Sequence, residues 1–139
     1  MTTVVADFQD RKRIVFTSRG RAQVNVREQL EDGPVGFTSV ELLLVALGNC
    51  VLGTLLNHEL LRDAEVNHAR ASLDAEMARD PARVTKITVD VDLEVEDPAL
   101  LQHREALEGG ACACPICNTL SGVEIVLSLQ MRAAGVAIA

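Results

Sequence analysis

The stretch that decides the fold is residues 33–56, GPVGFTSVELLLVALGNCVLGTLL. Thr38 stands three residues before Glu41, the spacing of a capping box, in which each side chain accepts a hydrogen bond from the other residue's backbone N–H. A helix therefore begins here, and we expect it over residues 40–62. Apolar side chains cover nearly the full circumference of its first half, which predicts a central helix buried in the core.

The bulk composition favours one ordinary globular domain and excludes some partners. The chain has 139 residues, 48% of them hydrophobic, and we expect a single domain over residues 1–139. Its net charge of −7 and its lack of Trp and Tyr argue against a nucleic-acid partner, which requires basic and stacking surfaces. The apolar run at residues 42–56 is shorter than the ~20 residues of a membrane span, so we expect no membrane partner. The first ten residues lack the pattern of a secretion signal, which predicts a cytoplasmic protein.

The segments around the helix predict an α+β fold. Residues rich in β-branched side chains predict antiparallel strands, and Pro after an N-cap residue predicts a helix start. We expect strands at residues 4–8, 12–17, 22–26, 69–78, 84–95 and 123–131, a polar loop at 28–36, and helices at 97–108 and from 115. Strand 84–95 alternates apolar and polar residues, which is typical of a strand with one buried face.

Two of the chain's four cysteines occupy chemically suggestive positions. Cys50 lies within the apolar helix, where a cysteine is either a small buried hydrophobe or a reactive thiol. Cys114 precedes Pro115, which places it at the N-cap of the last helix. There the helix dipole would stabilise a thiolate and lower the thiol pKa, although the thiol could also serve only as a cap.

Two other chemistries are conceivable for the cluster of Cys112, Cys114 and Cys117. A Cys-Pro-Ile-Cys redox motif of the thioredoxin type does not fit, because only 22 residues follow Cys117 and that fold needs many more. A metal site is the other alternative, with these thiolates as ligands and Cys50 or a histidine as the fourth. Three thiolates in six residues suit a soft metal.

Two motifs, in the right order, resemble the signatures of the OsmC/Ohr family, which takes its name from osmotically inducible protein C and organic hydroperoxide resistance protein. The first is Gly33-Pro-Val-Gly-Phe-Thr-Ser-Val-Glu-Leu-Leu-Leu-Val-Ala-Leu-Gly-Asn-Cys50, and the second is Cys114-Pro-Ile-Cys-Asn-Thr-Leu120 followed by a Val-rich strand. The order of the expected elements is similar over nearly the whole chain. The resemblance, to the OsmC-like subgroup, implies antiparallel sheets around a central buried helix and an intertwined homodimer with active sites at its interface.

The resemblance also implies a chemistry that needs no metal or organic cofactor. Cys50 would attack an organic hydroperoxide and become a sulfenic acid, and Cys114 would convert this to a Cys50–Cys114 disulfide. A dithiol, carried by a lipoyl protein in several members, would then reduce the pair. Leu47, Val51 and Leu55 are candidates for the apolar lining that favours organic peroxides.

Family members activate the first cysteine with an arginine from the N-terminal strands, oriented by a glutamate. Arg19 is our first choice for that arginine and Arg21 the second. The glutamate of well-studied hydroperoxide reductases corresponds to Val40 here, whereas Glu41 stands nine residues before Cys50. Nine helical residues rotate through roughly 900° and rise about 13 Å, so a partner subunit would have to bring Glu41 to Cys50. Glu41 could equally serve only the capping box.

Cys117 replaces a residue that is commonly polar in the family. We hypothesise that the Cys50–Cys114 disulfide migrates to the cluster with Cys112, against the alternative that these cysteines are incidental. Val40 also keeps a second function open, a non-catalytic or redox-sensing OsmC-like protein.

Overall fold

The computed structural model describes residues 1–135. The chain divides into two compact units, Met1–Leu42 and Leu43–Ala139, which we describe one at a time. The expectation of a single domain over residues 1–139 stays a prediction.

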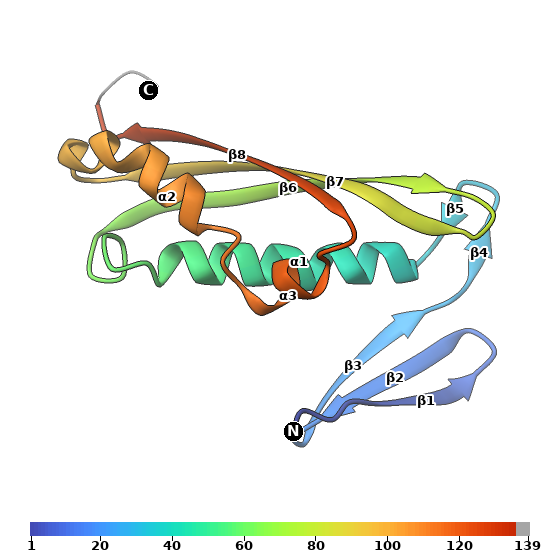
Figure 1. Ribbon diagram of the computed structural model, residues 1–139. Coiled ribbons are helices and arrows are strands. Elements are labelled where there is room, and N and C mark those ends of the chain that lie inside the picture. The colour runs from blue at the N-terminus through green and yellow to red at the C-terminus, as the bar shows by residue number, and fades with distance from the viewer. Residues whose placement is uncertain (136–139) are drawn as a thin grey trace. The chain divides into compact units, whose positions relative to one another are not determined.

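The first unit holds an antiparallel sheet of β1 (Val5–Asp10), β2 (Arg13–Ser18) and β3 (Arg21–Val26), as predicted (Figure 1). Arg19 and Gly20 connect β2 to β3, with φ angles of 50° and 74°. Positive φ at both central residues is the geometry of the tight hairpin turn that matches the twist of two strands. The expected polar loop contains a small ladder of β4 (Gln29–Leu30) and β5 (Gly33–Pro34).

Apolar side chains of the β1–β2–β3 sheet remain open to solvent. Phe8 on β1 is 71% exposed and Val24 on β3 is 55% exposed. Three-stranded sheets usually need a covered hydrophobic face for stability. Within the described residues, these side chains lack that cover.

The second unit is built on a sheet with the order β6 (Val66–Ala78), β7 (Arg83–Val95) and β8 (Glu124–Ala133). The expected antiparallel pairing is confirmed between β6 and β7, but β8 runs parallel to β7. The helical connection between them carries the chain back to the end of the sheet where β7 begins. Strand β8 therefore starts at the same end as β7 and runs parallel to it.

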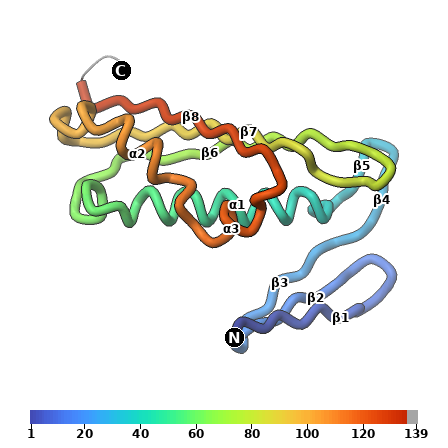
Figure 2. Tube along the Cα trace, viewed as in Figure 1, coloured from blue at the N-terminus to red at the C-terminus, as the bar shows by residue number. Residues whose placement is uncertain are grey.

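Strand β7 provides the centre of the core. Its alternation is confirmed: the five apolar residues of one face are at most 2% exposed, namely Ile87, Val89, Val91, Leu93 and Val95. Figures 1 and 2 show α1 (Ser39–Leu56) along one face of this sheet. A Cβ on Gly48 would lie 3.1 Å from Leu73 Cδ1, so the glycine allows α1 to approach β6 closely.

The start of α1 is predicted correctly, but its end and its burial are not. Thr38 Oγ1 accepts from Glu41 N at 3.1 Å and Glu41 Oε1 accepts from Thr38 N at 2.8 Å, which confirms the capping box. The helix ends at Leu56 rather than near residue 62. Turns follow the helix, and in them His58 Nδ1 accepts a hydrogen bond from Leu60 N. The helix ends here because local side-chain hydrogen bonds of this kind compete with the backbone hydrogen bonds of a helix.

Helix α1 is buried along one stripe only, which corrects the expectation of a fully buried first half. The buried residues are Leu47, Gly48, Val51 and Leu55, whereas Val45 is 50% exposed. Other residues of α1, such as Leu44, Cys50 and Leu52, pack only partly against the core. By length and composition α1 is the one described helix apolar enough to cross a membrane, but core helices pass the same test.

The connection from β7 to β8 carries three short helices. They are the 3-10 helix η1 (Pro98–His103), α2 (Arg104–Gly110) and α3 (Pro115–Thr119). Asp97 caps η1 as predicted, with Oδ1 accepting from Ala99 N at 2.9 Å. The expected single helix over residues 97–108 is instead 3-10 in its first half and α-helical in its second.

Candidate functional site

The site is the meeting point of Cys50 and Cys114. Cys50 lies in α1 and Cys114 at the start of α3, which lies beside the middle of α1 (Figure 1). The Cys50 side chain raises the pKa of Cys114, so the two thiols are close enough to interact. Both cysteines are free thiols, Cys50 half-buried and Cys114 only 1% exposed. The structure therefore brings together the two cysteines that the sequence singled out.

The exposure of Cys50 follows from its position on the helix. At roughly 100° per residue, Cys50 lies at the border between the buried stripe of α1 and its exposed face. Val51 on one side of it is fully buried, and Asn49 on the other is exposed. A thiol at this border can contact both the protein core and a molecule arriving from solvent.

Cys114 caps α3 as predicted. Its backbone is extended, Pro115 follows at the first helical position, and its Sγ accepts from Cys117 N at 3.4 Å. Extended backbone at the N-cap and Pro at the first turn are the usual start of a helix. The local sequence thus aims the Cys114 thiol at the first turn of α3.

The pKa of Cys114 shifts in the direction opposite to the one predicted from the sequence. Burial raises the pKa of this thiol above its ordinary value, and the neighbouring Cys50 side chain raises it further. The backbone N–H groups of Cys117 and Ile116 lower it, but by less. The predicted lowering by the helix N-terminus is therefore wrong, because loss of hydration disfavours the thiolate more than two amide dipoles favour it.

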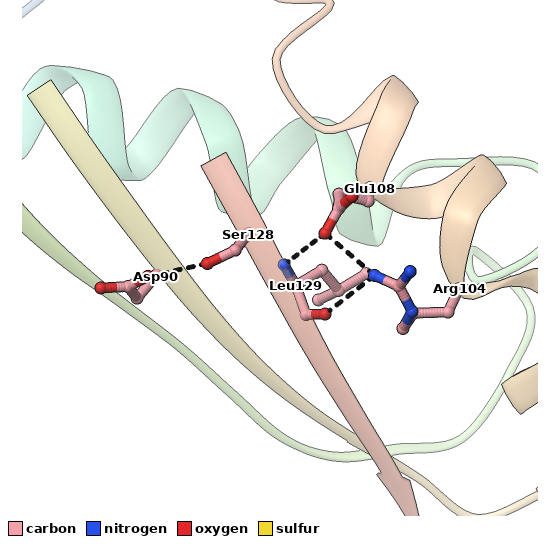
Figure 3. Close-up of polar contacts among 5 residues, drawn as sticks. All are labelled: Asp90, Arg104, Glu108, Ser128 and Leu129. Atoms are coloured by element: carbon pink, nitrogen blue, oxygen red, sulfur yellow. Dashed lines mark hydrogen bonds and ion pairs between the residues drawn. The ribbon is translucent and has the colours of Figure 1, made fainter. Parts of the chain in front are cut away.

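Polar side chains fix α2 against β8 (Figure 3). Helix α2 leads into the cysteine loop, the segment of residues 111–117 that carries Cys112, Cys114 and Cys117. Glu108 Oε2 accepts from Leu129 N at 2.8 Å, and Arg104 Nη1 donates to Glu108 Oε2 at 2.9 Å and to Leu129 O at 3.3 Å. We call Arg104, Glu108 and the Leu129 backbone the α2–β8 clamp. It satisfies backbone groups on an edge of β8 that would otherwise lack partners.

Sequence reasoning missed the α2–β8 clamp. The i,i+4 spacing of Arg104 and Glu108 was visible and is typical of an ion pair on a helix surface. Its attachment to β8 joins residues 21 and 25 positions apart in sequence, which a local pattern does not reveal. A second polar contact lies on the sheet itself, where Ser128 Oγ donates to Asp90 Oδ1 at 2.7 Å.

Cys112 and Cys117 form a disulfide, with their Cα atoms 5.7 Å apart. This bond removes two of the thiolates that the metal alternative requires, because a disulfide sulfur is a far poorer ligand than a thiolate. Among residues 1–135, no group of three or more His, Cys, Asp or Glu side chains could hold a metal ion. The metal site over Cys112, Cys114 and Cys117 is therefore not supported.

The predicted apolar lining is wrong. Leu47, Val51 and Leu55 are at most 1% exposed, because they form the stripe of α1 that packs into the core. They cannot contact a substrate without unpacking the helix from the sheet. A hollow of about 610 Å³ in the first unit, lined in part by Phe16 and Phe37, includes none of the cysteines.

The sequence matches the family of OsmC-like proteins over residues 30–128. The chain belongs to this family. The match includes Cys50 and all three cysteines of the α2–α3 region, whereas Arg19 and Arg21 lie outside it. No curated protein matches the sequence.

Solved structures share the OsmC-like fold over almost their whole length. The OsmC like protein from Mycoplasma pneumoniae has a TM-score of 0.74 at 15% identity, covering 94% of this chain and 96% of its own. The organic hydroperoxide resistance protein OhrB of Bacillus subtilis has a TM-score of 0.63 at 17% identity, covering 93% and 97%. An organic hydroperoxide resistance protein from Elizabethkingia anophelis has a TM-score of 0.71 at 9% identity, covering 95% and 96%. At these identities the likeness is one of fold.

The suggested supporting residues of this OsmC-like protein lie in its first unit. Arg19 is exposed in the β2–β3 turn, Arg21 opens β3, and Glu41 accepts the capping hydrogen bond from Thr38. Helix α1 is unbroken between Glu41 and Cys50. The capping role of Glu41 is confirmed, and the roles of all three residues toward Cys50 stay predictions.

Proposed function

We propose that this OsmC-like protein is a thiol-dependent peroxidase that reduces organic hydroperoxides. The observation that carries the proposal is the proximity of the Cys50 and Cys114 side chains, the first half-buried and the second fully buried. A peroxidase of this kind needs one thiol that a peroxide can reach. It also needs a second thiol close enough to close a disulfide.

The first step oxidises Cys50. Its thiolate attacks the terminal oxygen of the hydroperoxide R–O–O–H, so an S–O bond forms and the O–O bond breaks. The sulfur supplies the two electrons, and the departing alkoxide takes up a proton and leaves as the alcohol. Cys50 becomes a sulfenic acid.

The second step closes the disulfide. Cys114 attacks the sulfur of the sulfenic acid, the S–O bond breaks, and the hydroxide leaves as water with the proton of Cys114. An external dithiol, such as a lipoyl group, then restores both thiols by exchange and becomes a disulfide itself. No metal or organic cofactor takes part.

The distinct surroundings of the two thiols support these roles. The raised pKa of Cys114 keeps this thiol protonated while Cys50 reacts. A buried thiol that stays protonated is a poor target for peroxide, because the thiolate is the nucleophile. Cys114 therefore stays reduced until the Cys50 sulfenic acid forms, and it does not compete with Cys50 for the peroxide.

The relatives of the same fold supply the substrate class. Two of the matched structures are named as organic hydroperoxide resistance proteins, and their fold is shared over nearly the whole chain.

We assign Arg19, with Glu41 in support, to stabilise the Cys50 thiolate. We also assign the protein to the cytoplasm and to a homodimer whose partner covers the open faces of α1 and of the β1–β2–β3 sheet.

A redox-sensing protein is the second candidate. Val40 favours it, because the family's hydroperoxide reductases carry a glutamate at that position. Such a protein would form the Cys50–Cys114 disulfide but would turn over little peroxide.

The test is consumption of cumene hydroperoxide and of hydrogen peroxide by reduced protein, supplied with dihydrolipoamide. We expect turnover that prefers the organic peroxide and disappears in Cys50→Ser. The matched control is the double variant Cys112→Ser, Cys117→Ser, which should consume the first equivalent of peroxide as fast as the unchanged protein. A folded protein with free thiols that shows no turnover of either peroxide beyond the first equivalent would favour the sensor instead.

A further inference from the structure

The Cys112–Cys117 disulfide encloses Cys114 and has no part in the reaction above. Cys114 lies between the two bonded residues in sequence, and its Sγ accepts a hydrogen bond from Cys117 N. Cys50 is also close to this thiol, because α3 lies beside the middle of α1 (Figure 1). Cys114 is therefore close to both the reactive thiol and the backbone of the neighbouring disulfide.

The four sulfur atoms differ in how easily solvent reaches their residues. Cys114 is 1% exposed and Cys117 is 9% exposed, whereas Cys112 is half-buried in the turn between α2 and α3. Thiol–disulfide exchange depends on access to the sulfur that is attacked. In the Cys112–Cys117 disulfide, Cys112 is the sulfur that an external dithiol can attack. In the Cys50–Cys114 disulfide, Cys114 would be shielded from solvent but not from Cys117.

We propose that Cys112 and Cys117 form a relay dithiol that carries reducing equivalents from an external dithiol to the Cys50–Cys114 disulfide. The inference rests on the proposed function, because it assigns the route by which that disulfide is reduced. The relay makes Cys112 the entry point, Cys117 the internal nucleophile and Cys114 the acceptor.

The steps balance. An external dithiol reduces the Cys112–Cys117 disulfide and leaves as a disulfide. The Cys117 thiolate attacks Cys114 Sγ, a Cys114–Cys117 bond forms, and Cys50 leaves as a thiolate. The Cys112 thiolate then attacks Cys117 Sγ and releases Cys114. Two electrons have moved from the pair Cys112/Cys117 to the pair Cys50/Cys114, and the thiol protons are exchanged with water.

The state of the cysteines agrees with the final step of the relay. Cys112 and Cys117 are bonded to each other, while Cys50 and Cys114 are free thiols. The relay leaves the protein in this state, ready for both the next peroxide and the next dithiol.

The first experiment uses no peroxide, so it tests the relay whether or not the protein is a peroxidase. Protein with both disulfides formed by diamide receives one equivalent of dihydrolipoamide, and alkylated thiols are mapped by peptide mass over time. We expect the free thiols to end at Cys50 and Cys114, with the Cys112–Cys117 disulfide retained. In Cys112→Ser, Cys117→Ser, release of Cys50 should be slower by about tenfold or more, because an intramolecular thiol is replaced by an external one.

A second variant keeps the relay testable if the double variant Cys112→Ser, Cys117→Ser does not fold. Cys112→Ser keeps the attacking Cys117 but cannot complete the exchange, so full reduction of its disulfides followed by diamide should leave a Cys114–Cys117 disulfide and a free Cys50 thiol. Equal rates of Cys50 release in the double variant and the unchanged protein would overturn the relay. Failure of the peroxidase proposal would appear separately, as no peroxide consumption in protein that still exchanges its disulfides.

Discussion

Cys50 and Cys114 are neighbours with opposite surroundings. Cys50 lies at the edge of the buried stripe of α1, while Cys114 is enclosed by the core and caps α3. Burial affects a thiol mainly by making the thiolate costly, and here it outweighs the dipole of a five-residue helix. The chemical difference between the two thiols follows from this difference in position.

Removing the Cys50 thiol should lower the pKa of Cys114 without returning it to its ordinary value. The effect of the Cys50 side chain would be lost, but burial, the largest cause, would remain. Thiolate absorbance in the ultraviolet measures this cleanly, because the chain has no Trp or Tyr. The comparison is between Cys112→Ser, Cys117→Ser and the same protein with Cys50→Ala. An unchanged titration of Cys114 would show that the two thiols do not interact.

The same raised pKa predicts the pH dependence of stability. The unfolded chain releases the Cys114 proton at a lower pH than the folded chain does. The contribution to stability is therefore complete below the pKa of the unfolded thiol, and it is lost as the pH rises toward the pKa of the folded thiol. Denaturant unfolding in Cys114→Ser should show a weaker decline over this alkaline range.

Glu41→Gln separates the two roles of that residue. Glutamine also completes a capping box, so the free energy of unfolding should change little. If Glu41 orients Arg19 toward Cys50, peroxide turnover should fall in Glu41→Gln, and Arg19→Gln should cost about a hundredfold. Arg11→Gln, an exposed change in the same unit, is the control. Unchanged kinetics in Glu41→Gln would leave the residue with its capping role alone.

At the scale of secondary structure, the α2–β8 clamp positions the cysteine loop. Glu108 holds Leu129 N–H, and α2 leads directly to Cys112. Glu108→Ala should lower the free energy of unfolding by about 1–3 kcal/mol, because a backbone N–H of a buried residue loses its acceptor. Glu105→Ala, an exposed glutamate of the same helix, should change it by less than about 0.5 kcal/mol. Urea denaturation compares the two, and equal losses would contradict the clamp.

Local signals predicted the elements well, while their partners were harder to predict. The capping box of Thr38 and Glu41, the cap at Asp97 and the alternation of β7 depend on neighbours in sequence, and the structure confirms each. The direction of β8 depends on how the chain crosses over between strands. The end of α1 depends on competing turn contacts of His58. The periodicity of apolar residues predicts neither the direction of β8 nor the end of α1.

The site shows the same limit. The cysteine pair could be found from motif spacing, because Cys50 and Cys114 stand in recognisable sequence surroundings. The Cys112–Cys117 disulfide and the sign of the Cys114 pKa shift could not, because both depend on three-dimensional packing. Leu47, Val51 and Leu55 were misassigned for that reason, since apolar residues around a helix do not reveal which face meets the sheet.

For the whole molecule, the open apolar faces predict a homodimer. Val45 on α1 is 50% exposed, and the first sheet exposes Phe8 and Val24. Val45→Glu would place a charge on the apolar face of α1, and we expect it to convert a dimer to a monomer and to abolish turnover. Light scattering measures the mass, with Gln102→Glu, an exposed change in η1, as control. If the unchanged protein is a monomer in solution, the proposed homodimer is wrong.

The most direct test of the account is a chemical trap for the sulfenic acid on Cys50. Reduced Cys114→Ser protein receives one equivalent of cumene hydroperoxide in the presence of dimedone, and the adduct is located by peptide mass. We expect an adduct on Cys50, and in the unchanged protein a Cys50–Cys114 disulfide in its place. An adduct on Cys112 or Cys117 with Cys50 unmodified, or peroxide consumption that persists in Cys50→Ser, would contradict it.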